Sequence, residues 1–161
     1  MLQTFHIREF TTDDLESVKY INRLCLPENY TDHFFVDLYH RFPETFLVAE
    51  ERNQVVAYIM CRIETGLSIF GLHGLIKKGH IVSLAVLPQH RRRGIGQALV
   101  KGAMENMYSY KAEQCFLEVR KSNGPAIALY KKLGFQISRT VQHYYADGED
   151  AYLMSINLKS K

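Results

Sequence analysis

The sequence predicts an α/β protein: a three-layer α/β/α sandwich on a mixed central sheet of about seven strands, with about four helices. Two observations predict this class. Short β-branched and apolar runs alternate along the chain with segments whose apolar residues recur at helical spacing. One run, Gly79 to Leu87 (GHIVSLAVL), is apolar enough to be a strand buried on both faces. With 161 residues, the chain is expected to form a single domain, 1–161.

The N-terminal part predicts one strand and two helices. Thr4 to Phe10 alternates like a strand, and the Thr and Asp residues that follow are typical of a helix start. This first helix is expected to run to about Leu26, where Pro27 ends it. A second helix is expected from Thr31 to the residue before Pro43. Its apolar residues at helical spacing are Phe34, Phe35, Leu38 and Phe42.

Strands dominate the middle of the chain. Thr45 to Glu50 and Val55 to Glu64 read as a hairpin around a polar turn. The buried strand Gly79 to Leu87 follows and leads into a helix from about Gly94 to Ser109.

The C-terminal part continues the alternation. Glu113 to Arg120 reads as a strand, and Asn123 to Leu133 as a helix that Gly134 closes. Phe135 to Tyr145 and Tyr152 to Leu158 are expected to form a final pair of strands.

Composition narrows the function classes. The chain is 47% hydrophobic and 23% charged, which is typical of a globular protein, and no apolar run approaches the ~20 residues of a membrane helix. We therefore expect a cytoplasmic protein that does not interact with membranes. Three cysteines, Cys25, Cys61 and Cys115, lie far apart in apolar segments, so they are expected to be reduced, and their spacing predicts no metal site.

Charge is unevenly distributed. Between Lys77 and Lys132 there are eleven Lys and Arg residues but three Asp and Glu residues, although the whole chain carries only +3. A nucleic-acid-binding surface would spread its arginines along one face among exposed aromatic residues. Here three arginines are adjacent and run into two glycines, so a nucleic-acid partner is disfavoured.

These arginines form the segment Arg91 to Gly96, RRRGIG, where the buried strand gives way to a helix. A helix N-terminus has unpaired N–H groups and a partial positive charge, which suit a phosphate. Gly94 and Gly96 let the backbone approach a pyrophosphate, and arginines neutralise its charge. From the residues alone, a solvated basic turn is the alternative.

Two motifs resemble the GNAT acetyltransferase superfamily. Arg91, Gly94 and Gly96 fit its R-x-x-G-x-G/A loop, and SNGPAIALYKKLGF (Ser122 to Phe135) is similar to its N-x-x-A-x-x-L-Y-x-x-x-G-F segment. Three further strings resemble NatA-type N-terminal acetyltransferases and their archaeal single-chain relatives. They are LCLPENY, GHIVSLAV and YYADGEDAY, at 24–30, 79–86 and 144–152. The resemblance covers nearly the whole chain.

The resemblance implies transfer of an acetyl group from acetyl-CoA to the α-amino group of protein N-termini. A same-fold enzyme that acts on protein lysine or a small amine is the alternative, and a non-catalytic scaffold is disfavoured by the retained motif residues. Direct attack on the thioester is expected, because no cysteine has a recognisable base nearby in the sequence. The implied acetyl-CoA residues are Leu84, Ala85, Val86, Arg91, Arg92, Arg93, Gly94, Ile95, Gly96, Gln97, Asn123 and Tyr130.

Within that set, the resemblance gives the pantetheine arm to strand 84–86 and Asn123, and the phosphates to 91–97. Tyr130 would protonate the departing thiolate, and the Val86 N–H would hold the oxyanion. From the residues alone, Asn123 is equally a helix cap and Tyr130 equally a core aromatic.

Three side chains compete to accept the proton of the α-amine, whose pKa of ~8 leaves it mostly protonated at neutral pH. They are Glu28, His80 and Glu118. The alternatives are an exposed loop glutamate, a histidine at the edge of the core, and a glutamate paired with a cation. NatA-type subunits that need a partner usually have histidine at the place of Glu118, so this chain is expected to act without an auxiliary subunit.

Peptide binding is assigned by the resemblance to one loop and one hairpin. The residues are Leu26, Pro27, Glu28, Tyr30, Tyr144 and Tyr145. The two tyrosines are expected to alternate across a strand, so that only one faces the groove. The acidic residues beside them, Asp147, Glu149 and Asp150, are interpreted as solvating a turn. Which N-terminal residues are preferred, and whether the chain docks on the ribosome, is left open by the sequence.

Overall fold

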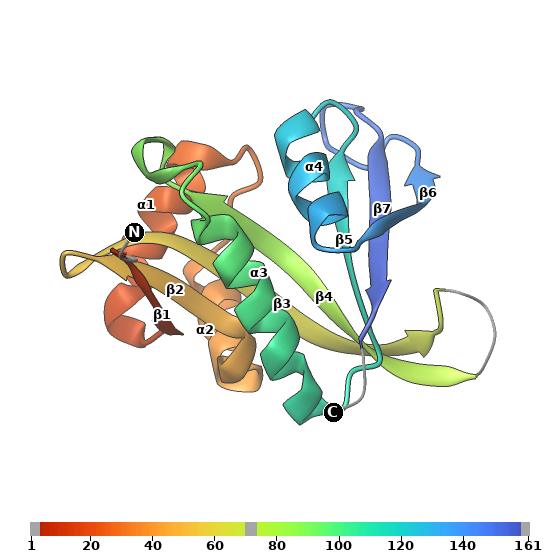
Figure 1. Ribbon diagram of the computed structural model, residues 1–161, viewed down its shortest axis with the longest axis horizontal. Helices are drawn as coiled ribbons and strands as arrows, with labels where there is room; N and C mark the ends of the chain where they lie inside the picture. The colour runs from red at the N-terminus through yellow and green to blue at the C-terminus, as the bar shows by residue number, and fades with distance from the viewer. Residues whose placement is uncertain (1–3, 70–73, 159–161) are drawn as a thin grey trace. The chain divides into compact units, whose positions relative to one another are not determined.

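The computed structural model describes residues 4–69 and 74–158, and its elements follow the predicted order (Figure 1). The strands are β1 His6–Glu9, β2 Phe46–Glu51, β3 Gln54–Leu67, β4 Leu75–Val86, β5 Gln114–Arg120, β6 Gln136–Val141 and β7 Ala151–Asn157. The α-helices are α1 Leu15–Cys25, α2 Asp32–Arg41, α3 Ile95–Met107 and α4 Gly124–Lys132. The strands of these described residues form one mixed sheet in the order β1-β2-β3-β4-β5-β7-β6, and β4 runs parallel to β5. The predicted fold class is confirmed.

Two compact units make up the described chain. The first comprises described residues of Met1–Arg62 and Ile81–Met107, and the second those of Ile63–His80 and Tyr108–Lys161. The long strands β3 and β4 contribute to both units. The single domain 1–161 that the sequence predicts stays a prediction.

In the first unit, helices cover both faces of the sheet (Figure 1). Phe46 and Val48 of β2 point to a buried cluster that also contains residues of α1 and α2. Leu47, between them, points to the other face, where a Cβ added at Gly102 of α3 would lie 3.1 Å from its Cδ1. Successive side chains of β2 therefore pack against helices on opposite faces of the sheet.

Local capping explains where the first helices begin. Thr31 caps α2 as expected, since its Oγ1 accepts a hydrogen bond from the Phe34 N–H at 3.2 Å. Helix α1 begins later than predicted, at Leu15, because Thr12–Asp14 form a 3-10 turn. The Asp14 carboxylate closes that turn by accepting the Thr11 N–H at 2.8 Å and pairs with the Arg8 guanidinium.

In the second unit, the two faces of β5 have different surroundings. Ile156 of β7 pairs with Cys115 of β5 and points to α4, because a Cβ at Gly134 would lie 3.1 Å from the Ile156 Cδ1. Phe116 and Glu118, which alternate with Cys115, therefore point to the opposite face. The face away from α4 is the one that bears Glu118.

Three strand boundaries differ from the prediction by three or more residues. Strand β4 begins at Leu75, four residues before Gly79, since Lys78 pairs with Gln114 and lays its ammonium over the Phe116 ring at 5.1 Å. Strand β3 continues past Glu64 to Leu67. Strand β6 ends at Val141, so the expected strand through Tyr145 is wrong.

No helix among the described residues is long and apolar enough to cross a membrane. This finding concerns the helices of residues 4–69 and 74–158 only.

Candidate active site

The glycine-containing loop of the first unit starts a helix as the sequence predicts. The Gly94 carbonyl accepts the Ala98 N–H at 3.0 Å, and α3 begins at Ile95, whose side chain is buried. The first-turn N–H groups of Ile95, Gly96 and Gln97 therefore have no partner within the helix. Such a helix N-terminus attracts anions.

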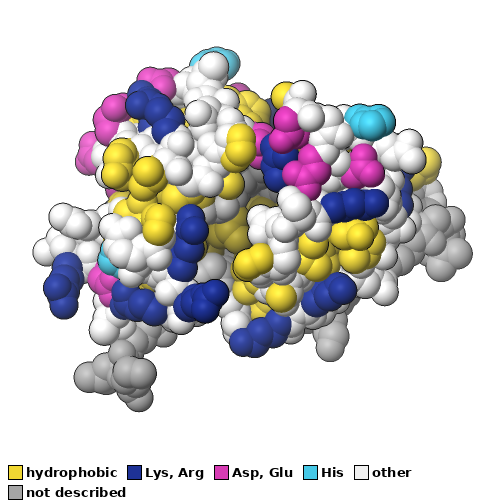
Figure 2. Space-filling model, turned by 90° about the horizontal axis from the view of Figure 1, so that it is seen from above, with side chains coloured by type: hydrophobic (Ala, Val, Ile, Leu, Met, Phe, Trp, Pro, Cys, Tyr) yellow, Lys and Arg dark blue, Asp and Glu magenta, His cyan; other side chains and the backbone are white. Residues whose placement is uncertain are grey.

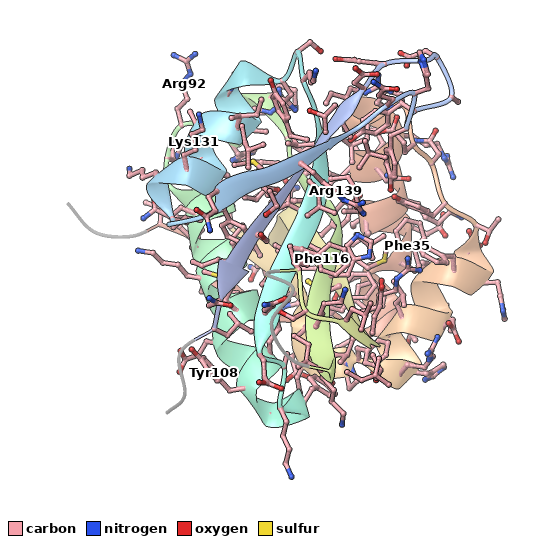
Figure 3. The ribbon with its side chains drawn as sticks, turned by 90° about the vertical axis from the view of Figure 1, so that its right-hand side faces the viewer. Phe35, Arg92, Tyr108, Phe116, Lys131 and Arg139 are labelled. Carbon is pink, nitrogen blue, oxygen red and sulfur yellow. The ribbon has the colours of Figure 1, made fainter. Side chains whose placement is uncertain are left out.

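The three arginines of this loop lie in three different environments. Arg91 donates from Nε to the Val86 carbonyl at 2.8 Å, which ties the loop to the end of β4. Arg93 donates from Nη1 to the Glu51 carboxylate at 2.9 Å. Arg92 is exposed, has a φ of 62°, and projects from the ribbon in Figure 3.

Gly94 has a φ of 83°, a conformation that costs an L-residue ~1–2 kcal/mol. A Cβ there meets no atom within 4 Å, so Gly94→Ala tests the backbone alone. We expect its Tm to fall by ~3 °C, at ~2–4 °C per kcal/mol. Gly124→Ala, which also meets no atom within 4 Å and has no positive φ, is the matched control. Equal melting curves for the two variants would contradict the account.

Glu51 is a buried carboxylate at the centre of the polar cluster beside this loop. Its Oε1 lies 2.9 Å from Arg93 Nη1 and 2.7 Å from His90 Nδ1, and its Oε2 accepts the Thr4 hydroxyl at 2.6 Å and a second bond from Arg93. The hydrogen bonds from Arg93, then Thr4 and His90, lower the pKa of Glu51 to about 2. Glu51 thus holds Arg93 in place.

This lowered pKa gives a prediction for acid stability. Because the folded protein holds the Glu51 proton more weakly than the unfolded chain does, its contribution is complete above the ordinary value of 4.5 and is lost as pH falls towards about 2. Glu51→Gln should lower Tm at pH 6 and reduce the Tm difference between pH 6 and pH 3. Calorimetry of both proteins at these two pH values checks it. An unchanged Tm difference would show that other carboxylates carry the acid sensitivity.

The loop Leu26 to Tyr30 is held by hydrogen bonds to the side chain of Asn22, which is 1% exposed. Asn22 Nδ2 donates to the Glu28 carbonyl at 3.0 Å and to the Tyr58 hydroxyl at 3.1 Å. Its Oδ1 accepts the Tyr30 N–H at 3.2 Å. The Tyr30 hydroxyl donates to the Val82 carbonyl at 3.4 Å, which fastens the end of the loop to β4.

Sequence reasoning missed Asn22, although a signal was available. Val18, Ile21 and Cys25 repeat at helical spacing on the apolar face of α1, and Asn22 interrupts that face. A polar residue at a core position of a helix indicates a buried partner.

In the second unit, the structure brings His80 and Glu118 together. His80 Nε2 lies 2.7 Å from Glu118 Oε1, and the Phe116 ring stacks on the imidazole at 4.3 Å and 11°. Both side chains are largely buried, at 8% and 15% exposed. The sequence left open a histidine at the edge of the core and a glutamate paired with a cation, and the structure joins the two residues in one hydrogen-bonded pair.

Glu64 joins this pair and was also missed. Its Oε2 lies 2.7 Å from His80 Nδ1, so the imidazole has a carboxylate at each nitrogen. The signal for Glu64 in the sequence is weak, because Glu64 is the last residue of the predicted strand and no neighbouring residue sets the direction of its side chain. The extension of β3 to Leu67 places it within the strand.

Asn123 and Tyr130 are positioned by α4. Asn123 caps the helix, with Oδ1 accepting the Ala126 N–H at 3.2 Å, which is the alternative that the sequence left open. Tyr130 is 6% exposed and packs edge-on against Phe135 at 5.5 Å.

Tyr144 and Tyr145 lie in the loop between β6 and β7, so alternation across a strand is wrong for them. Arg120 organises this loop, with its guanidinium 4.1 Å from the Tyr145 ring centroid and Nη1 within 2.9 Å of Asp147 and Glu149. Tyr144 is 47% exposed and packs edge-on against Tyr145.

The acidic residues of the loop therefore hold its shape rather than solvate a turn. Hydrogen bonds from Ser122 and Arg120 lower the pKa of Glu149 to about 2. Asp150 accepts the His143 N–H at 2.9 Å and lies 3.6 Å from Lys121.

Comparison with known proteins identifies the family. Residues 15–135 match the Acetyltransferase (GNAT) family. The chain belongs to the GNAT family.

Relatives in this family are similar to this chain over nearly its whole length. An N-alpha-acetyltransferase of Sulfurisphaera tokodaii is 53% identical over 156 residues, which are 96% of this chain and 93% of the relative. The crystal structure of Ard1 from Thermoplasma volcanium is 32% identical, with a TM-score of 0.86 over 98% of this chain and 100% of that one. Arabidopsis thaliana Naa50 in complex with the bisubstrate analogue CoA-Ac-MVNAL is 28% identical, with a TM-score of 0.80 over 99% and 100%.

The family resemblance predicted from the sequence motifs is thus confirmed. On the face shown in Figure 2, Lys and Arg side chains are scattered among hydrophobic, uncharged and acidic ones. Among the described residues, no group of three or more His, Cys, Asp and Glu side chains has the arrangement of a metal site.

Proposed function

We propose that this chain is an N-α-acetyltransferase, which transfers the acetyl group of acetyl-CoA to the α-amino group of protein N-termini. The observation that carries the proposal is the similarity, over almost the whole chain, to an enzyme of that name. A buried histidine–glutamate pair supports it, because acetylation of an α-amine must remove a proton and such a pair can take it.

The residues present fit acetyl-CoA. The first-turn N–H groups of α3 offer donors to the pyrophosphate, and Gly94 leaves the approach open, with no atom within 4 Å of its missing Cβ. All three arginines are exposed, but Arg91 and Arg93 bond to Val86 and Glu51, so Arg92 is proposed to meet a phosphate of the cosubstrate. The backbone of 84–86 is proposed to bind the pantetheine arm like an added strand, and the Asn123 carboxamide nitrogen to donate to it.

The proposed reaction is direct attack of the amine on the thioester carbonyl. The His80–Glu118 pair accepts the ammonium proton through a water, the Val86 N–H donates to the oxyanion, and Tyr130 protonates the departing thiolate. Cys115 is no candidate nucleophile, since complete burial raises the pKa of its thiol. Glu28 is assigned to binding of the peptide N-terminus, with Leu26, Pro27, Tyr30, Tyr144 and Tyr145.

The proposed protein partners are nascent or free N-termini in the cytoplasm, without an auxiliary subunit. Glu118 supports independence of a partner, because its carboxylate completes the proton-accepting pair within this chain. Purified protein that acetylates no peptide until a second subunit is added would disprove this part of the proposal.

A peptide panel tests the proposal. Peptides that differ in the first residue, each with an internal lysine, are incubated with acetyl-CoA and mapped by mass spectrometry. Acetylation at the α-amine supports the proposal. Acetylation confined to the lysine, or to small amines in a parallel assay, would replace it with the same-fold alternative.

Tyr130→Phe tests the assigned acid. Because only the hydroxyl is removed and the ring keeps its contact with Phe135, we expect a kcat that is lower by about 10–100-fold with little change in acetyl-CoA affinity. Steady-state kinetics and calorimetric binding of CoA measure the two quantities. Unchanged turnover would remove Tyr130 from the mechanism.

A further inference from the structure

The imidazole of His80 has an acidic neighbour on each side. Nδ1 lies 2.7 Å from Glu64 Oε2, and Nε2 lies 2.7 Å from Glu118 Oε1. The side chains of Glu64, His80 and Glu118 are 34%, 8% and 15% exposed. Glu64 belongs to none of the motifs that define the acetyl-CoA or peptide residues.

Proton counting restricts the states of this cluster, the Glu64–His80–Glu118 triad. An ionised carboxylate only accepts hydrogen bonds, and a neutral imidazole donates from one nitrogen while it accepts at the other. Two hydrogen bonds therefore need two protons among the three groups. The imidazole carries both, or it carries one and a carboxyl carries the other. Either way the triad has a net charge of −1, and both ring nitrogens of His80 are engaged in hydrogen bonds.

Loss of one proton leaves a net charge of −2 and a single hydrogen bond. In this state one ring nitrogen has a free lone pair and can take the proton of an α-ammonium, after which the triad returns to −1 and later releases the proton to solvent. The ring nitrogen that keeps its proton then determines which of the two nitrogens can accept the next one. If Glu64 accepts from Nδ1, the free lone pair of Nε2 is on the side of Glu118.

Other charged groups on these strands are positive. Lys78 of β4 lies over the ring of Phe116, which stacks on His80. Arg62 precedes Glu64 by two residues on β3. Arg139 of β6 pairs with Leu153, which pairs with Glu118, so the three share one face of the sheet; Phe116 and Arg139 are labelled in Figure 3. β7 contributes Leu153 and Ser155 to this face, and neither is charged.

We propose that Glu64 is a positioning residue, which holds the Nδ1 proton of His80 and so directs the proton-accepting nitrogen towards Glu118. This inference rests on the proposed function for its kinetic consequence, but the hydrogen bonding of His80 is independent of activity. The stacked Phe116 ring fixes the plane of the imidazole, and Glu64 fixes its tautomer.

The test compares Glu64→Gln with the wild type in two measurements. NMR of protein labelled with ¹⁵N-histidine reports the ring nitrogens of His80 without substrate, with His80→Gln identifying the signals. The second measurement is kcat against pH at saturating peptide. Glu113→Gln, the same exchange at an exposed residue of the second unit, is the control.

Glu64→Gln should change the ¹⁵N shifts of both His80 nitrogens. It should also move the rising limb of kcat to lower pH, because one negative charge that favoured the protonated triad is gone. Glu64→Asp keeps the charge and should restore much of the wild-type limb.

Unchanged His80 signals in Glu64→Gln would overturn the proposal. Changed signals with an unchanged limb would also overturn it, since Glu64 would then be a structural partner only. A wild type that acetylates no N-terminus would refute the proposed function instead, and the NMR comparison would still decide the role of Glu64 in holding His80.

Discussion

Glu118→Gln is expected to lower kcat by about 10²–10⁴-fold, the typical contribution of a positioned general base. The amide keeps the size of the side chain and can still hydrogen-bond to His80 Nε2, but it cannot share a transferred proton. The KM for acetyl-CoA should change little, because the proposed phosphate site lies on the loop before α3. Stopped-time assays with a saturating N-terminal peptide give kcat, and circular dichroism confirms folding.

The contrasting variant is Glu28→Gln, which should raise the KM of the peptide more than it lowers kcat. The double variant His80→Gln/Glu118→Gln should be little worse than Glu118→Gln, since residues that act as one unit are not additive. If Glu28→Gln lowers kcat as much as Glu118→Gln does, Glu28 in the loop 26–30 is the general base instead. If both retain the full rate, the proton reaches solvent by another path.

Asn22→Leu is expected to destabilise the protein by about 3 kcal/mol, because buried polar partners lose their hydrogen bonds without access to water. The Glu28 carbonyl, the Tyr30 N–H and the Tyr58 hydroxyl all lose the Asn22 carboxamide. Tyr58 keeps Ser83 at 2.6 Å, and burial raises the pKa of its phenol, so it stays a neutral hydroxyl. A Tm lower by ~6–12 °C follows for a chain of this size.

The loop 26–30 should also lose its fixed shape in this variant, so the peptide KM should rise while the affinity for CoA persists. Asn29→Ala is the control, because Asn29 is exposed and bonds to the Asn22 and Leu26 carbonyls. Its Tm should fall by less than half as much. If Asn22→Leu melts at the wild-type temperature, the loop is held by other contacts.

Local signals account for the part of the fold that the sequence predicts. Thr31 caps a helix through the Phe34 N–H, three residues away, and Gly94 precedes α3 with a positive φ. Both features depend on neighbours in the chain, so capping and turn rules find them. Residues 79–86 of the apolar run lie in β4, as the run's β-branched and apolar composition predicts.

Contacts between residues far apart in the chain account for the part that the sequence could not predict. Arg93 and Glu51 are 42 residues apart, and Glu118 and His80 are 38 apart. Whether such residues meet depends on strand register, where a shift by one residue reverses every side chain. For this reason the sequence predicts neither the contact of Glu64 with His80 nor the end of β6 before Tyr144. The predicted ends of β3 and β6 lie a few residues from where the strands end in the structure.

The hydrogen bonds from Arg91 to Val86 and from Arg93 to Glu51 affect the rate and the thermodynamics of acetyl-CoA binding. A loop already fastened at both ends has little conformational entropy left to lose, so binding should resemble the docking of a ligand on a rigid surface. The association rate should then respond to ionic strength, through the exposed charge of Arg92, more than to loop rearrangement. Glu51, which never touches the cosubstrate in this scheme, would favour binding by holding Arg93 and the loop in place before acetyl-CoA arrives.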